Sequence, residues 1–174
     1  MLVLGIDPGT ANTGYGVVRG AGGMASSLVE CGVIRTRARD PLPARLREIY
    51  EGVQDLIERH KPDALAVEDV FYSRNVRTTV VLGHARGVIL LAGANAGLEI
   101  HEYPPSEIKK AVAGTGAATK LQVQFMVARL LRLKSAPQPT DAADGVAAAL
   151  AFALAPSLPK IESIRRRDYI IPTG

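Results

Sequence analysis

The sequence predicts an α/β fold in which a five-stranded mixed sheet carries helices on both faces. Two patterns along the chain favour this fold. Three β-rich runs come first, separated only by short links, which is typical of an antiparallel meander. Later apolar runs alternate with helical segments, which is typical of parallel strands joined by helical crossovers. A length of 174 residues suits one domain with a single core, which we expect over residues 1–158.

The first three strands are expected at residues 2–6, 14–18 and 28–36. The first run, LVLGI, is apolar throughout, as in a central strand that is buried on both faces. The glycine-rich residues 20–23 separate the second and third runs, and such a cluster indicates a turn.

The rest of the chain alternates between helical and strand patterns. Two further strands are expected, a short buried one at residues 64–67 and another at residues 99–103. Helices are expected at residues 42–59, 78–96, 106–113, 120–133 and 141–155, the first because its apolar residues recur at helical spacing between prolines. The last helix is rich in alanine and has no charge after Asp144, so we expect it to be buried on nearly all sides.

The composition narrows the class of protein. With 47% apolar and 22% charged residues, the chain has the balance of a soluble globular protein. Its net charge of +4 mildly favours an anionic partner such as nucleic acid. Cys31 is the only cysteine, which excludes an intrachain disulfide and a thiolate zinc site. The apolar runs at 87–98 and 145–158 are shorter than the roughly 20 residues that span a bilayer. We therefore expect a cytoplasmic protein without membrane contact, and a basic tail at residues 159–174.

Four acids stand at the ends of predicted elements. Asp7 follows the first strand, Glu68 follows the fourth, and Asp141 and Asp144 lie three apart at the start of the last helix. If the first and fourth strands are neighbours, Asp7 and Glu68 project at the same edge, and a spacing of three places the other two on one helical face. Carboxylates brought together raise one another's pKa unless cations neutralise them. Mg²⁺ prefers oxygen ligands, and two such ions about 4 Å apart cleave phosphodiesters in many nucleases.

Each acid also has a simpler interpretation. Asp7 precedes a Pro-Gly pair and fits a turn, and Glu68 fits an ordinary surface position. Asp141 and Asp144 fit a capping box, with Asp141 at the N-cap and Asp144 at the third helical position. The joint occurrence of all four favours the metal site.

Successive motifs resemble those of the RuvC family of bacterial Holliday-junction resolvases. They are GIDPGTANTGYGVV, CGVIRT, AVEDVFYSRN, LGHARGV, GTGAATKLQVQFMV and PTDAADGVAAAL, and they run from residue 2 to about 155. The resemblance implies a ribonuclease-H-like fold and a homodimer that cuts two opposed strands of a four-way DNA junction in recombination and repair. It implies two Mg²⁺ ions per active site, with Mn²⁺ as a substitute, held by Asp7, Glu68, Asp141 and Asp144. It also implies a branch-migration motor as partner.

The same resemblance gives roles to other residues. Phe71 matches an aromatic residue that stacks on or wedges against bases near the crossover, although an ordinary core position is the alternative. Lys120 matches a basic residue near the scissile phosphate that steadies charge in the transition state, although a solvated lysine is the alternative. The apolar helix at residues 80–94 matches one that helps to form the dimer interface. Further DNA contacts are expected at Tyr72, Arg74, Arg77, Lys109, Lys110, Gly114 and Gly116.

Two other functions are open from the sequence. GIDPGT and TGYGVV also resemble the first phosphate loop of the actin-like and sugar-kinase ATPases, but those proteins close two lobes around ATP and this chain offers one domain. A non-catalytic junction-binding protein of the same fold is the second alternative, and the presence of all four acids disfavours it. Asp69 departs from the family, which often has a neutral residue there; it either supports the metal ligands or repels DNA. The three histidines are expected to be structural.

Overall fold

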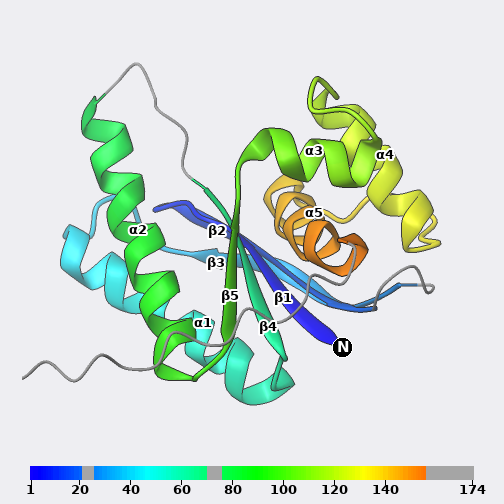
Figure 1. The fold of residues 1–174 in the computed structure, drawn as a ribbon. Helices are drawn as coiled ribbons and strands as arrows, with labels where there is room; N and C mark the ends of the chain where they lie inside the picture. The colour runs from blue at the N-terminus through cyan, green and yellow to red at the C-terminus, as the bar shows by residue number, and fades with distance from the viewer. Residues whose placement is uncertain (21–25, 70–75, 156–174) are drawn as a thin grey trace, which may run out of the picture.

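The computed structural model describes residues 1–20, 26–69 and 76–155. Its centre is a five-stranded sheet with the order β3-β2-β1-β4-β5 (Figure 1). The strands are β1 (Leu2–Asp7), β2 (Asn12–Arg19), β3 (Ser27–Arg35), β4 (Ala64–Glu68) and β5 (Glu99–Tyr103). The first three pair antiparallel, whereas β4 runs parallel to both β1 and β5. The predicted mixed sheet is confirmed.

Helices cover both faces of this sheet (Figure 1). They are α1 (Leu42–His60) and α2 (Val76–Asn95) on one face, and α3 (Pro105–Ala113), α4 (Lys120–Leu130) and α5 (Thr140–Leu154) on the other. Successive residues of β1 therefore enter different cores, because side chains alternate across a strand. Leu4 and Ile6 pack with α1 and α2, whereas Val3 packs with α5. Burial on both faces explains why the first strand is apolar without alternation.

The backbone of α5 packs directly on β1 and β2. Ten of its 15 residues are buried, as the sequence predicts. A Cβ added at Gly14 of β2 would lie 1.8 Å from the carbonyl oxygen of Asp141, and one added at Gly145 would lie 2.5 Å from Cα of Tyr15. Only glycine permits an approach this close. Gly14 is also the register partner of Asp7, so the contact places the start of α5 beside the end of β1.

The end of the fourth helix differs most from the sequence expectation. The fourth helix ends at Leu130 rather than at residue 133. Arg132 adopts a left-handed conformation with φ of 54°, and the Leu133 amide donates to the carbonyl oxygen of Ala128 at 2.8 Å. The chain therefore turns away after α4 although its apolar residues continue.

The histidines lie in structural contacts or on the surface. His60 Nε2 lies 2.8 Å from a carboxylate oxygen of Glu30, which ties the end of α1 to β3. The His101 ring lies 4.6 Å from the Phe152 ring, between centroids, and His84 is exposed on α2. Within the three described ranges, no helix combines the length and apolarity that a membrane crossing requires.

The close approach at Gly14 predicts a large effect of one methyl group. Gly14→Ala places a Cβ 1.8 Å from a backbone oxygen, so α5 must shift and the free energy of unfolding falls by at least about 2 kcal/mol. Gly83→Ala is the matched control, because nothing lies within 4 Å of a Cβ at that helical position; alanine there adds up to about 1 kcal/mol of stability. Urea unfolding measures both. A Gly14→Ala midpoint equal to that of the wild type contradicts the contact.

Candidate active site

Two of the four acids come together because of strand order. Asp7 is the last residue of β1 and Glu68 is the last residue of β4. These strands are parallel neighbours, with Ile6 in register with Val67. Their carboxyl ends meet at one edge of the sheet, as strand adjacency predicts, and both side chains line a cavity of about 260 Å³.

The start of α5 brings the other two acids to the same edge. Carboxylate oxygens of Asp7, Asp141 and Asp144 all lie within 4.8 Å of one another. Pro139 occupies the N-cap of α5, and no side chain caps the helix. The capping-box interpretation of Asp141 and Asp144 is therefore wrong. Their carboxylates are instead part of the acidic cluster, where oxygen donors at this spacing suit a hard divalent cation.

Burial and mutual repulsion raise the pKa of three of these acids, Asp7, Glu68 and Asp144. Burial, followed by the charges of Glu68, Asp144 and Asp141, raises the pKa of Asp7 to about 8. Burial and the charge of Asp144 raise the pKa of Glu68 to about 7. Burial also raises the pKa of Asp144, although Lys120 acts in the opposite direction. A bound divalent cation reverses this balance, because it favours the ionised form of every carboxylate around it.

Two lysines bring positive charge to the cavity. The Lys120 Nζ donates to Asp144 Oδ2 at 2.7 Å, and this hydrogen bond raises the pKa of the lysine. Lys120 is the first residue of α4. The residue before it, Thr119, caps the helix, and its side chain accepts a hydrogen bond from the backbone amide of Gln122. Lys109 of α3 lines the same cavity and lowers the pKa of Glu68. Both lysines therefore line the same cavity as Asp7, Glu68 and Asp144.

The other predicted contact residues are spread more widely. Lys110 lines a different cavity, beside Tyr103 and Glu107. Gly114 is the C-cap of α3 with φ of 81°, and Gly116 lies against Ser106. Arg77 is exposed in the first turn of α2. Phe71, Tyr72 and Arg74 lie outside the described residues.

Some of the site's surroundings were missed by the sequence interpretation. The cavity wall includes Pro105, Val123 and Ala147. Of these, only Val123 was indicated by the sequence, because it follows Lys120 by three residues and lies on the same helical face. Asp69, whose role was left open, forms an ion pair with Arg86 of α2 at 3.3 Å. Arg86 also pairs with Glu102 of β5. Asp69 is therefore held away from the acidic cluster, and no local sequence pattern indicates this long-range pairing.

Comparison with known proteins assigns this chain to a family. The sequence model of the family described as crossover junction endodeoxyribonuclease RuvC matches residues 3–152. Proteins of that name from Desulforamulus reducens and Moorella thermoacetica are 47% and 51% identical over 154 residues, which is 88% of this chain and 93% and 91% of theirs.

Solved structures agree with the sequence comparison. The chain is similar to RuvC of Thermus thermophilus in complex with a Holliday junction substrate, with a TM-score of 0.84 and 38% identity, over 88% of this chain and 93% of that one. The yeast mitochondrial Holliday junction resolvase Ydc2 shares the fold, with a TM-score of 0.65 and 12% identity over 87% of this chain and 77% of its own. The fold is ribonuclease-H-like, as the resemblance implies. This chain belongs to the RuvC family of crossover junction endodeoxyribonucleases.

Proposed function

We propose that this protein resolves four-way DNA junctions by metal-dependent cleavage of two opposed strands. The observation that carries the proposal is the acidic cluster, in which oxygens of Asp7, Asp141 and Asp144 lie within 4.8 Å of one another beside Glu68. Family membership supplies the reaction class, and the cluster supplies residues suited to it.

The acids fit divalent ions by their chemistry. All offer oxygen donors, and burial with mutual repulsion raises the pKa of Asp7 to about 8 and that of Glu68 to about 7. We infer that Asp7, Glu68, Asp141 and Asp144 would hold two Mg²⁺ ions, with Mn²⁺ as a substitute. Such ions supply a nucleophilic water at neutral pH and stabilise the leaving oxygen.

The chain's own residues orient this chemistry. β1 and β4 present Asp7 and Glu68 from rigid strand ends, and α5 presents the other two acids from a buried helix. Lys120 donates a hydrogen bond to Asp144 at 2.7 Å, and this bond would fix Asp144 as a metal ligand. The Lys120 ammonium group would then lie beside the scissile phosphate. A fixed positive charge at that position stabilises the extra negative charge of the transition state.

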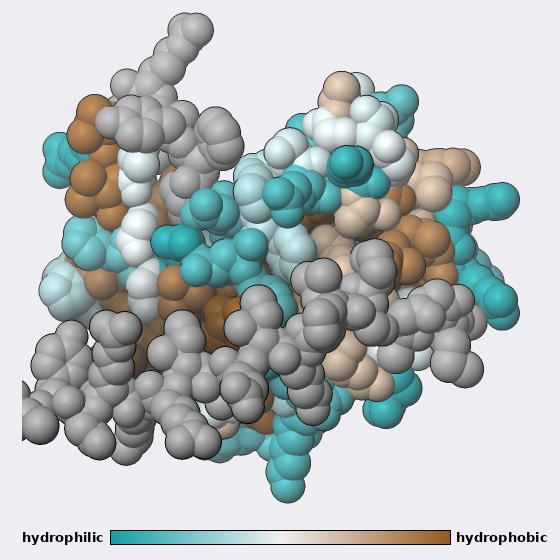
Figure 2. Space-filling view, viewed as in Figure 1, coloured by the Kyte–Doolittle hydropathy of each residue, from teal (hydrophilic) through white to brown (hydrophobic). Residues whose placement is uncertain are grey.

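A homodimer would give two such sites for two strands. The outer part of α2 carries hydrophobic residues, at the left of the view in Figure 2, and it exposes Val76 by 64%, Val80 by 53% and Leu91 by 52%. Exposed apolar side chains on one helix are typical of an interface. They support the interpretation of α2 as the dimer contact, where two-fold symmetry would place two identical sites on a near two-fold junction.

The alternative functions have less support. An ATPase lobe gives no reason for four acids to gather at one edge of the sheet. The comparisons favour the resolvase family instead. A non-catalytic junction-binding protein gives no reason to bury carboxylates whose repulsion destabilises the fold. The branch-migration motor stays a prediction of the family resemblance.

Asp7→Asn tests the catalytic assignment. The amide keeps the shape of the carboxylate but removes a charged metal ligand, so junction cleavage falls by more than about 100-fold. Junction affinity, measured by a gel-shift assay in Ca²⁺, stays near that of the wild type. Asp40→Asn, in the loop before α1, is the control and leaves both values unchanged. Wild-type cleavage by Asp7→Asn excludes Asp7 from the reaction.

The raised pKa values predict a characteristic pH dependence of stability. Asp7 and Glu68 have a higher pKa in the folded than in the unfolded protein, so the folded state binds more protons between about pH 4 and pH 8. Their contribution to the free energy of unfolding is therefore present at low pH and is lost as pH rises to 8. Thermal melting with a chelator should show a lower Tm at pH 8 than at pH 5, and the difference should be smaller in Asp7→Asn. When Mn²⁺ replaces the chelator at pH 8, the Tm of the wild type should recover. Equal pH slopes in wild type and Asp7→Asn contradict the shift.

Lys120→Ala tests the proposed positive charge. Without it, the transition state loses a fixed cation, and single-turnover cleavage slows by about 100-fold. Lys134→Ala, an exposed lysine after α4, serves as the control and changes the rate by less than about threefold. Quenched-flow measurement at saturating protein separates the rate from affinity. An effect of Lys120→Ala on affinity alone would make Lys120 a simple DNA contact.

A further inference from the structure

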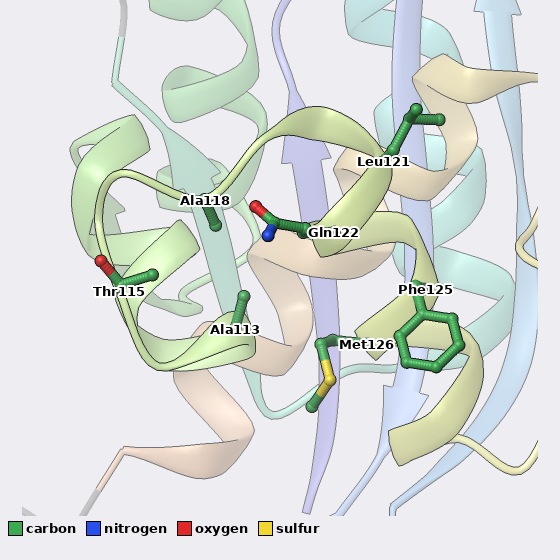
Figure 3. Close-up of a pocket in the computed structure, with 7 residues that line it drawn as sticks. All are labelled: Ala113, Thr115, Ala118, Leu121, Gln122, Phe125 and Met126. Atoms are coloured by element: carbon green, nitrogen blue, oxygen red, sulfur yellow. The ribbon is translucent and has the colours of Figure 1, made fainter.

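The outer face of α4 carries the most exposed large apolar side chain among the described residues. Leu121 is 77% exposed, and Phe125, one helical turn later, is 63% exposed. Both line a cavity of about 380 Å³ between the end of α3 and α4 (Figure 3). We call this cavity the α4 pocket; it is lined by Ala113, Thr115, Ala118, Leu121, Gln122, Phe125 and Met126. An apolar surface of this kind, outside the core, is typical of a protein interaction site.

The lining of the α4 pocket favours an apolar occupant. Each of its two polar side chains already accepts a hydrogen bond from the neighbouring backbone. Gln122 Oε1 accepts from the Thr119 amide at 2.8 Å, and Thr115 Oγ1 accepts from the Ala117 amide at 3.3 Å. The remaining lining is aliphatic, aromatic and thioether. A nucleobase placed here would leave much of its hydrogen-bonding edge without a partner, whereas leucine or phenylalanine side chains would not.

The α4 pocket lies on a different face of the helix from the acidic cluster. Lys120 and Val123 line the acidic cavity, whereas Leu121 and Phe125 line the α4 pocket. The exposed side chains therefore have no role in holding the metal ligands. A partner bound on this face would leave the acidic cavity open to DNA.

The charge around the α4 pocket selects for an acidic partner. Residues 108–140 contain no Asp or Glu. The Arg129 guanidinium lies 6.0 Å from the centre of the Phe125 ring, and Arg132 and Lys134 follow after α4. Arg129 beside Phe125 attracts carboxylates. It disfavours this chain's own basic tail, which carries three consecutive arginines at residues 165–167.

We propose that the α4 pocket is the docking site for a segment of a partner protein that carries apolar side chains one helical turn apart and is flanked by Asp or Glu. The apolar side chains fill the pocket against Phe125 and Met126, and the acids meet Arg129 at its rim. This is recognition of an amphipathic helix by an apolar groove. It concerns a different surface from the one that cleaves DNA and does not depend on the proposed catalytic roles.

Peptide selection with the full chain tests the proposal. A display library of random 15-residue peptides is selected against the wild-type protein, and the winners are synthesised and titrated by fluorescence anisotropy. We expect apolar pairs three or four residues apart, flanked by Asp or Glu. Affinity should fall at least tenfold in Phe125→Ser and in Arg129→Glu. Val29→Ser, an exposed position on β3, is the matched control and should leave affinity unchanged. Circular dichroism checks that each variant is folded.

Three results would overturn the proposal. If the selected peptides bind Phe125→Ser and the wild type with equal affinity, or if they are basic, the α4 pocket is not a docking site for an acidic segment. A junction affinity that falls tenfold in both Leu121→Ser and Phe125→Ser makes the surface a DNA contact instead. A peptide affinity that rises when Ile170 and Ile171 are replaced by Ser in the full chain makes the chain's own tail the occupant.

Discussion

The structure depends on the direct contact between the backbone of α5 and the backbones of β1 and β2. Glycines at residues 14 and 145 remove the side chains that would keep them apart. Without this contact, Asp141 and Asp144 would stand farther from the sheet, and its edge would present only Asp7 and Glu68. The same contact explains why α5 is built of small residues, since ten of its 15 residues are buried. Packing and chemistry are thus set by one interface.

This interface concentrates negative charge where burial makes charge costly. The pKa of Asp7 rises to about 8 mainly because the carboxylate is buried, and to a smaller extent because the neighbouring carboxylates repel it. Lys120 and Lys109 relieve only part of the repulsion. A fold that retains such a cluster gives up stability in the metal-free state, and the same four acids are the divalent-ion ligands of our proposal. Asp69 differs from these acids because it forms an ion pair with Arg86 at 3.3 Å. In our proposal the clustered acids bind metal, whereas Asp69 connects β4 to α2.

Much of this architecture could be predicted because its determinants are local. Apolar runs and turn signals located every strand of the sheet, and the short links predicted the antiparallel pairing of the first three. The adjacency of β1 and β4 was a condition of the sequence argument, and the structure supplies it. The convergence of Asp7 with Glu68 required only that β1 and β4 be neighbours. The capping-box alternative failed because Pro139, not Asp141, precedes the helix, and a local pattern did not distinguish the two. The Asp69–Arg86 pair and the α4 pocket arise from tertiary packing, so no spacing in the sequence indicated them.

Proton release on metal binding tests the central claim most directly, that the fold itself forces these carboxylates together until a cation neutralises them. Mn²⁺ is titrated calorimetrically into the metal-free full chain at pH 7, in two buffers of different ionisation enthalpy. With the pKa of Asp7 at about 8 and that of Glu68 at about 7, binding should release between about one and two protons per chain, because the ion requires ionised ligands. Mn²⁺ binding without proton release, or no binding at all, would contradict the account.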